Sequence, residues 1–300
     1  YSAVHPEGCL LIMGGMEAEN EHSSAAGVLA RYKDLGDSQD ECVKEALLEV
    51  RGLLDGEKSL DSREEAQLQE LLARIHLAND DADAALEAAQ EAQSSAAQFS
   101  DRRLEAQAQL TVAQVYLKRG ELDRAAQAAQ EAQSLCQRED DRRQEVRALL
   151  VLSSVLMAKD NVQEALDAAG EARLVAEQSE DKEGEANALR SLSDIYQERG
   201  DLDQALELAR KERLCREKTK QKRGAALALL NIVNLHTCRG ETKAAARAAE
   251  AARTLCRKEG SRLADLLVES LTLAAQAHML VVSQLDEDAE QPEGPAKDRR

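Results

Sequence analysis

The chain has 300 residues and a formal net charge of −18 at pH 7, which argues against a molecule whose whole surface binds nucleic acid or an anionic membrane. Aromatic residues make up only 2% and Trp is absent, while 43% of residues are hydrophobic, so the apolar content comes from Ala, Leu and Val. No proline lies between Pro6 and Pro292, and this combination predicts an all-α fold and excludes a strand-rich one.

Residues 1–20 are expected to form a flexible N-terminal segment. Their longest apolar stretch, Cys9 to Met13, is too short to span a bilayer and lacks the flanks of a signal peptide. A start at Tyr1 in place of Met is compatible with a fragment, so the missing signal has little weight.

The six cysteines form no C-x-x-C pair and have no zinc-site spacing, which indicates a reducing compartment. We expect a cytoplasmic protein without metal or cofactor.

Residues 21–60 resemble a degenerate copy of the repeats that follow them. The pattern runs from Val28 to Leu53 and has about five extra residues in its turn. Tyr32, Gly36 and Ala46 stand where related residues recur further along the chain.

Residues 61–260 divide into five consecutive blocks of forty residues that align without a gap. Each block contains two helical patterns separated by a turn. The turn position is occupied by residue types that tolerate the left-handed backbone conformation with which helices end. These residues are Asp80, Gly120, Asp160, Gly200 and Gly240.

The second helix of each block has one face lined with alanine at spacings of four and three residues. In the fourth block Glu212 replaces the third alanine of this face. Larger apolar residues on the first helix complete the core. They are Leu72, Val112, Leu152, Leu192 and Ile232. One hairpin cannot bury its own apolar face, so the pattern predicts that the hairpins stack on one another.

The chain is expected to end with two further segments. Residues 261–285 have the pattern of a single C-terminal capping helix that covers the last hairpin. Residues 286–300 are rich in charged residues and contain two prolines, which predicts a disordered tail.

The five blocks resemble tetratricopeptide repeats (TPR). The first-helix consensus is matched by Val112–Tyr116 and by Leu192–Tyr196, and the small residues of the second helix agree with the family pattern. Asn231–His236 is similar to the forty-residue subclass found in Pins-type spindle-orientation adaptors and kinesin light chains. The resemblance implies a right-handed superhelical solenoid of stacked helix-turn-helix hairpins.

The resemblance also implies a ligand groove, since the first helices of TPR proteins line a concave face that binds a partner peptide or helix. The acids expected there are Glu70, Asp194 and Glu198. The partner-binding residues that follow from this position are Arg74, Gln107, Gln114, Lys118, Arg147, Ser154, Asn187, Arg190, Asp194, Asn231 and Asn234.

Other features of the sequence do not point to catalysis. There is no phosphate-binding glycine loop and no nucleophile or metalloprotease motif. His76 and His236 occupy a packing column that holds tyrosine elsewhere. Cys136, Cys215 and Cys256 near the ends of second helices are interpreted as small core residues.

Residues 210–223 contain eight basic and two acidic residues, a charge of +6 in a chain that is otherwise −24. This stretch either docks an acidic or phosphorylated segment or is a solvated helix end that offsets nearby carboxylates. Without interleaved aromatics, nucleic acid is not expected to bind there.

The sequence therefore predicts a protein-protein interaction scaffold or adaptor that is not an enzyme and binds neither nucleic acid nor membrane. The alternative is a regulatory or substrate-docking arm of a larger enzyme or signalling protein whose catalytic domain lies outside this chain. The sequence does not indicate the oligomeric state.

Overall fold

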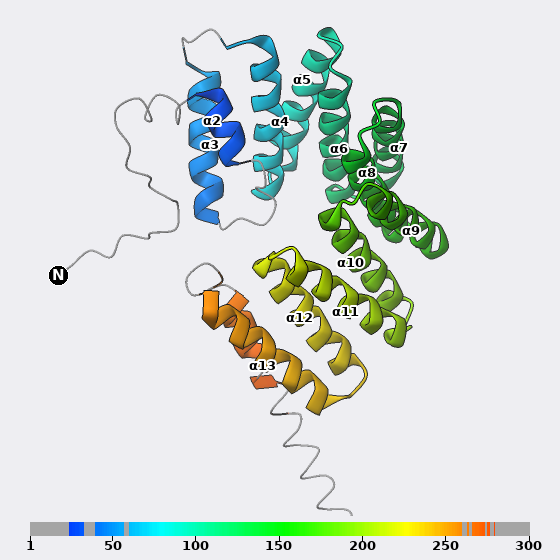
Figure 1. The fold of residues 1–300 in the computed structure, drawn as a ribbon. Helices are drawn as coiled ribbons and strands as arrows, with labels where there is room; N and C mark the ends of the chain where they lie inside the picture. Colours follow the sequence, from blue (N-terminus) through cyan, green and yellow to red (C-terminus); the bar gives the residue numbers. More distant parts are fainter. Residues whose placement is uncertain are drawn as a thin grey trace, which may run out of the picture. The chain divides into compact units, whose positions relative to one another are not determined.

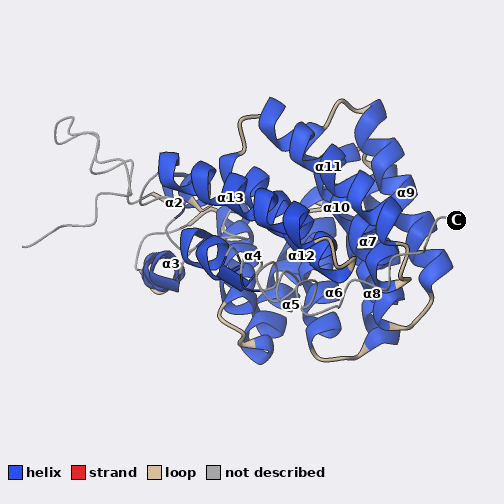
Figure 2. Ribbon diagram, turned by 90° about the horizontal axis from the view of Figure 1, so that it is seen from below, coloured by secondary structure: helices blue, strands red, loops and turns tan. Residues whose placement is uncertain are grey.

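A computed structural model describes residues 24–32, 40–56 and 60–259, followed by 263, 266–273, 275, 276 and 279. Within these residues the structure contains helices, turns and loops and no strand (Figure 2). The helices, in chain order, are α2 (Ala25–Arg31), α3 (Asp40–Leu54), α4 (Ser62–Ala78), α5 (Ala82–Gln98), α6 (Arg102–Lys118), α7 (Leu122–Arg138), α8 (Arg142–Ala158), α9 (Val162–Gln178), α10 (Lys182–Glu198), α11 (Leu202–Lys218), α12 (Lys222–Cys238) and α13 (Thr242–Glu259).

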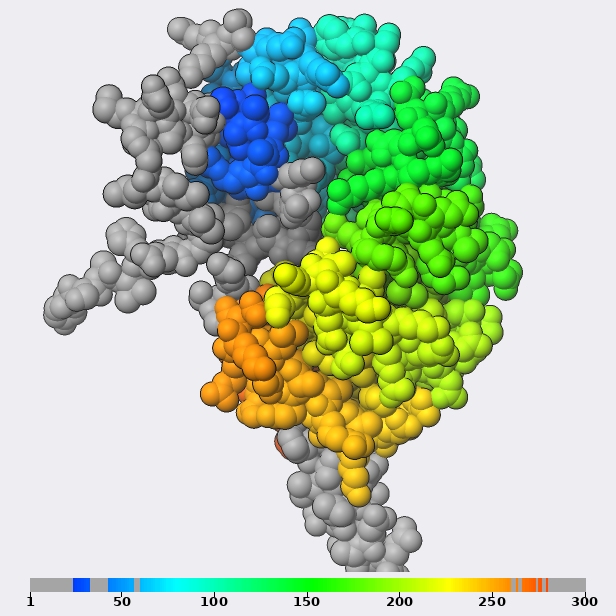
Figure 3. All heavy atoms as spheres, in the orientation of Figure 1, coloured from blue at the N-terminus to red at the C-terminus, as the bar shows by residue number. Residues whose placement is uncertain are grey.

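The described helices divide into two compact units, and the boundary lies between Gly184 and Glu185 in the first turn of α10. The first unit holds α2–α9, and the second holds the rest of α10 with α11–α13 (Figure 1). In the first unit each helix from α4 to α9 packs on the next, and α6 also contacts both α4 and α8. In the space-filling view, successive hairpins within a unit lie against one another in sequence order (Figure 3). The all-α fold of stacked hairpins is confirmed.

The turn inside each hairpin has the left-handed residue that the sequence predicts. The φ angles are 63° at Asp80, 74° at Gly120, 64° at Asp160, 84° at Gly200 and 72° at Gly240. The following residue closes the helix, as where the Asp81 amide donates to the His76 carbonyl at 2.9 Å. This bond satisfies a carbonyl that the helix end would otherwise leave without a partner.

A second set of left-handed residues, which the sequence analysis missed, ends the second helix of four repeats. Ser100, Asp140, Glu180 and Lys220 have φ angles of 57°, 51°, 55° and 60°. None is glycine, and their side-chain types vary, so no residue signal marks the turn. The next helix then begins at a capping residue such as Asp101, whose carboxylate accepts from the Leu104 amide at 3.2 Å.

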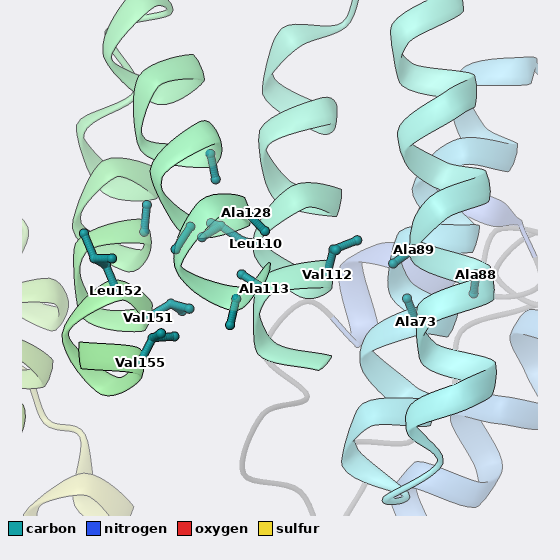
Figure 4. Close-up of a cluster of buried hydrophobic side chains, with 14 residues drawn as sticks. Ala73, Ala88, Ala89, Leu110, Val112, Ala113, Ala128, Val151, Leu152 and Val155 are labelled. Atoms are coloured by element: carbon teal, nitrogen blue, oxygen red, sulfur yellow. The ribbon is translucent and has the colours of Figure 1, made fainter. Parts of the chain in front are cut away.

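The alanine faces of the second helices form the centre of each unit. Ala89, Ala129, Ala169, Ala209 and Ala249 have no solvent-accessible surface. In the first unit the valines and leucines of the neighbouring helices fill the space beside these alanines, as where Val112 of α6 points toward Ala89 of α5 (Figure 4). Small side chains therefore set a close helix spacing, and the larger residues come from the first helices.

The ends of the described chain pack on the outermost hairpins. In α2 and α3, Val28, Val43 and Val50 form a buried cluster with Leu68 and Ile75 of α4. At the other end the buried side chains of residues 263 and 266 contact α12 and α13. Residues 1–20, residue 36 and residues 286–300 lie outside the described residues.

One sequence interpretation is wrong. Cys136 and Cys256 are buried, but Cys215 is half-exposed. It lies one residue before the repeat position that small residues occupy in the other repeats, which we call the small-residue column. That column holds Ala96, Cys136, Ala176 and Cys256, and in the fourth repeat it holds Arg216. Burial raises the pKa of the Cys136 thiol to about 12, in keeping with a core residue.

Candidate functional site

The first helix of each hairpin (α4, α6, α8, α10 and α12) is called helix A below, and the second is called helix B. The polar residues that the sequence analysis assigns to the ligand groove divide between the A helices of the two compact units, and each group is named here as a helix-A surface. The first helix-A surface, on α4, α6 and α8, comprises Gln67, Glu70, Arg74, Gln107, Gln114 and Arg147. The second helix-A surface, on α10 and α12, comprises Asn187, Arg190, Asp194, Asn231 and Asn234.

A buried carboxylate links the helices of the first helix-A surface. Glu70 is only 8% exposed, and the Thr111 hydroxyl of α6 donates to its Oε1 at 3.4 Å. The Arg74 guanidinium lies 3.7 Å from Glu70 Oε2. Burial raises the pKa of Glu70, whereas the charges of Arg74 and Arg147 act in the opposite direction. The charges of two arginines from different repeats therefore both act on Glu70.

Arg147 is exposed, and its guanidinium donates a hydrogen bond to the Gln144 amide oxygen at 3.2 Å. Within the described part of the chain, no carboxylate lies within ion-pair distance of Arg147. Burial by the surrounding protein and the charge of Arg74 both lower the pKa of Arg147. This side chain is thus crowded by protein on one side and open to solvent on the other.

Two other predicted residues of this region make contacts within the fold. The Lys118 ammonium donates to the Leu77 carbonyl at 2.9 Å and contacts Asp80 at 2.7 Å, so Lys118 holds the turn of the preceding hairpin. The Ser154 hydroxyl donates to the Leu150 carbonyl of its own helix at 3.0 Å. Gln107 and Gln114 are half-buried on α6, between α4 and α8.

The second helix-A surface contains one loose ion pair and three amides. Arg190 and Asp194 are 3.9 Å apart. Burial raises the pKa of Asp194, and Arg190 opposes this shift. The Asn231 amide donates to the Ser193 hydroxyl of α10 at 3.4 Å, which joins α12 to α10, and Asn234 is exposed.

Asn187 belongs to an internal cluster that the sequence analysis did not find. Its amide oxygen accepts from the Arg216 guanidinium at 2.6 Å, and Gln221 accepts from the same guanidinium at 2.9 Å. Arg216 Nε lies 3.4 Å from Oε1 of Glu212, which is completely buried. Gly224 leaves the space, because a Cβ there would lie 2.5 Å from Arg216 Cδ.

The cluster changes the interpretation of the basic stretch, residues 210–223. Arg216 and Glu212 are buried and cannot act as a solvated surface. Lys211 pairs with Glu207 at 2.6 Å, and Lys222 lies 3.7 Å from Glu259. Part of the stretch therefore serves the fold and part offsets neighbouring carboxylates, as the solvated-end alternative expects.

The two histidines are packing residues with a polar contact. His76 and His236 are 5% and 6% exposed. The His236 Nδ1 atom lies 2.6 Å from the Glu241 carboxylate, and His76 Nδ1 lies 3.6 Å from Asp81. Each carboxylate belongs to the residue that follows the left-handed residue of the turn. The contact between histidine and carboxylate therefore holds the turn against the end of helix A.

The described residues contain no group of three His, Cys, Asp or Glu side chains that could hold a metal ion. Similarly, none of the described helices is both long and apolar enough to span a bilayer.

Comparison with known proteins gives a family match for one segment of the chain and similar folds for most of it. No curated protein sequence matches the chain. The family profile of the tetratricopeptide repeat matches residues 144–213. A Rap protein complexed with Competence and Sporulation Factor is 16% identical, with a TM-score of 0.62 over 91% of this chain and 84% of the Rap chain.

Two further solved structures have a similar fold. NprR in complex with its cognate peptide NprX is 13% identical, with a TM-score of 0.59 over 95% of this chain and 80% of NprR. A signal-transduction ATPase with a tetratricopeptide repeat sensor, from Pyrococcus horikoshii, is 12% identical, with a TM-score of 0.62 over 92% of this chain and 41% of the ATPase. At these identities the likeness shows the fold alone.

The subclass of Pins-type adaptors and kinesin light chains stays a prediction. The forty-residue hairpins, their left-handed turns and their alanine faces agree with the profile match. Residues 144–213 match the tetratricopeptide repeat family, and the described hairpins on either side of this segment have the same two-helix form.

Proposed function

We propose that this protein is an interaction scaffold or adaptor that binds a partner peptide or helix along its helix-A surfaces and has no catalytic activity of its own. The observation that supports this proposal is that the A helices keep amide and guanidinium groups accessible to solvent. Arg147 and Asn234 are exposed, and Gln114 and Asn231 are half-exposed.

Amide and guanidinium side chains suit a peptide ligand. An amide donates and accepts hydrogen bonds, so it can satisfy a peptide group on either side. Affinity would be spread over several repeats and would not depend on one deep pocket. The solved complexes of NprR with a peptide and of a Rap protein with Competence and Sporulation Factor support a protein or peptide as the class of ligand.

We also propose that residues 21–60 act as a sixth, degenerate repeat, that residues 61–260 form five repeats, and that residues 261–285 act as a terminal cap. The clusters around Val43 in α3 and around the buried side chain at position 263 support this division, because both cover an end hairpin. Such end units shield apolar surface that the outermost repeats would otherwise expose.

Affinity purification tests the proposal. The full chain serves as bait in a cell extract, in parallel with a variant that carries Asn231→Ala and Asn234→Ala. The matched control carries Gln204→Ala and Arg210→Ala, because both side chains are exposed on helix B of the same unit. We expect partners to be lost by the helix-A variant and kept by the control, since each lost hydrogen bond to a buried group costs about 1–3 kcal/mol. Loss of the Asn231–Ser193 hydrogen bond should lower the melting temperature of the helix-A variant only slightly. Loss of partners by the control and retention by the helix-A variant would contradict the proposal.

The alternative function is a docking or sensing arm of a larger enzyme or signalling protein. The ATPase of Pyrococcus horikoshii supports this alternative, because its repeats act as the sensor of a longer chain. Sequencing the complete transcript distinguishes the two functions: a catalytic domain in the same reading frame favours the alternative.

A further inference from the structure

Three helix ends meet at one edge of the second unit. In that unit α12 lies between α11 and α13 (Figure 1). The Arg216 guanidinium in the last turn of α11 donates to the side chain of Gln221, the residue before α12, at 2.9 Å. The Lys222 ammonium in the first turn of α12 lies 3.7 Å from the Glu259 carboxylate at the end of α13. These two contacts bring the end of α11, the start of α12 and the end of α13 together.

Five cations and one carboxylate lie at these helix ends, and we call this group the basic edge. Its members are Lys218, Lys220, Lys222, Arg257, Lys258 and Glu259. All five cations are exposed. The chain as a whole carries −18, so a place where cations outnumber carboxylates in this way is unusual for the molecule.

The two acids of the basic stretch, residues 210–223, are already paired with other bases. Glu212 is completely buried, and its Oε1 lies 3.4 Å from Arg216 Nε. The Glu217 carboxylate lies 3.6 Å from the Arg213 guanidinium. Within the described part of the chain, four cations of the basic edge have no carboxylate within ion-pair distance. They are Lys218, Lys220, Arg257 and Lys258.

The preceding junctions between repeats carry acids that this junction lacks. In each of them an aspartate before helix A accepts from a first-turn amide, at 3.2, 3.2 and 3.1 Å respectively for Asp101, Asp141 and Asp181. A base in the first turn can also have an acid beside it, as where Arg102 lies 3.4 Å from Glu105. Before α12 the aspartate is replaced by Gln221, and the first turn of α12 contains no acid. The excess of cations is therefore specific to this junction and is not a general property of the repeat.

The kind of ligand follows from the kind of cation. Four of the five cations are lysines, and an ammonium is a point charge without the planar fork that selects a single carboxylate or phosphate. Cations spread over three helix ends match a row of negative charges better than one isolated group. A segment with several Asp or Glu side chains supplies such a row.

Other polyanions fit the basic edge less well. Helices α11–α13 contain no Phe, Tyr or Trp on which a nucleic-acid base could stack. A nucleic acid or an anionic membrane also extends past the edge and meets a chain whose net charge of −18 repels it. A short acidic segment contacts the edge alone, so it avoids most of this repulsion.

We propose that the basic edge docks a short Asp- or Glu-rich segment of a partner protein. The docking site uses none of the residues of the two helix-A surfaces, so it does not depend on the proposed function. Exposed charges are screened within about 10 Å at 0.1 M salt, so the affinity should fall steeply as salt is added.

Fluorescence polarisation with a labelled peptide tests the proposal. The probe is a blocked peptide of eight glutamates, and a peptide of eight glutamines serves as the uncharged control. The full chain is compared with two variants that lose the same charge. The edge variant carries Lys218→Gln, Lys220→Gln, Arg257→Gln and Lys258→Gln. The control variant carries Arg138→Gln, Arg210→Gln, Lys243→Gln and Arg247→Gln, which change exposed bases on other parts of the helices.

We expect the wild-type chain to bind the glutamate peptide and not the glutamine peptide. At about 0.05 M salt the edge variant should bind the glutamate peptide about tenfold or more weakly than the wild type, because several ion pairs are lost together. The control variant should bind about as tightly as the wild type. At about 0.5 M salt the difference between the chains should disappear. Thermal melting of each variant shows that the fold is intact.

Three results would overturn the proposal. One is absence of binding to the wild-type chain, and another is undiminished binding to the edge variant. Equal losses in the two variants would show that overall charge attracts the peptide and that the basic edge does not. A short DNA duplex and vesicles containing phosphatidylserine are measured in parallel. If either binds more tightly than the glutamate peptide and is lost in the edge variant, the edge belongs to that class of partner and the proposal is wrong. The helix-A variants are tested with other ligands, so failure here leaves the proposed function standing.

Discussion

Replacing Glu212 by glutamine should stabilise this protein at neutral pH. The carboxyl is completely buried in the fourth repeat, at a position where the other repeats have alanine. Burial raises the pKa of Glu212 from 4.5 to about 7, against the opposing effects of Arg216 and Arg190, while Asp194 adds to the rise. The pKa is therefore higher in the folded state than in the unfolded state.

The sign and size of the effect follow from this difference. Between pH 4.5 and 7 the folded chain holds a proton that the unfolded chain releases, so the free energy of unfolding falls as pH rises. This difference in pKa corresponds to a loss of at most about 3 kcal/mol, which is complete above pH 7. Glutamine keeps the volume and the acceptor for Arg216 but does not ionise.

Urea unfolding followed by circular dichroism at pH 5 and pH 7.5 measures this effect, with hydrogen exchange of α11 as the local readout. We expect Glu212→Gln to match the wild type at pH 5 to within about 1 kcal/mol and to exceed it by up to about 3 kcal/mol at pH 7.5. Glu217→Gln, a change of an exposed carboxylate on the same helix, should not alter the pH dependence. A destabilised Glu212→Gln at pH 7.5 would refute the reasoning, since it would mean that Arg216 more than offsets the burial of the charge.

Three further predictions concern the packing, the turns and Lys118. Ala129→Phe should lower the free energy of unfolding in urea by about 1–3 kcal/mol, because Ala129 is fully buried. Gln127→Phe on the exposed side of the same helix should lower it much less, and equal losses would disprove the helix-B register. Asp160 and Gly240 both have φ near 70°, a left-handed conformation that favours glycine. Asp160→Gly should therefore raise the free energy of unfolding by a few tenths to about 1 kcal/mol, and Gly240→Ala should lower it by about 1 kcal/mol. Opposite signs in thermal melting would count against the turn assignment. Lys118→Ala should lower the melting temperature slightly and leave peptide affinity unchanged, and a large loss of affinity would return Lys118 to the binding surface.

The repeating features of the fold could be predicted because each depends on residues that recur every forty positions. Gly120 and Gly240 mark their turns directly, and the burial of Ala129 follows from its place in a helical period. The turns after helix B could not be predicted in the same way. Glu180 and Lys220 adopt left-handed angles without any residue preference for them, because the neighbouring helices fix the backbone there.

Features of single repeats were the least predictable. Arg216 belongs by composition to an exposed basic stretch, but it is buried because Gly224 gives it space and Asn187 accepts its hydrogen bond. Three residues from three helices must meet before that outcome is visible. For the same reason the polar contacts of Lys118 and Asn187 could not be inferred from their positions in the forty-residue repeat, although both positions lie on helix A.

Photo-crosslinking from single positions tests the central claim that partners bind on helix A. A photoreactive amino acid replaces Gln114 or Asn234 on helix A, and Gln127 or Gln204 on helix B, in otherwise identical full chains. The probe is a labelled partner identified by the affinity purification. We predict crosslinks from the two helix-A positions and none above background from the two helix-B positions. Crosslinks confined to the helix-B positions would contradict the account and place the ligand on the opposite face of the hairpins.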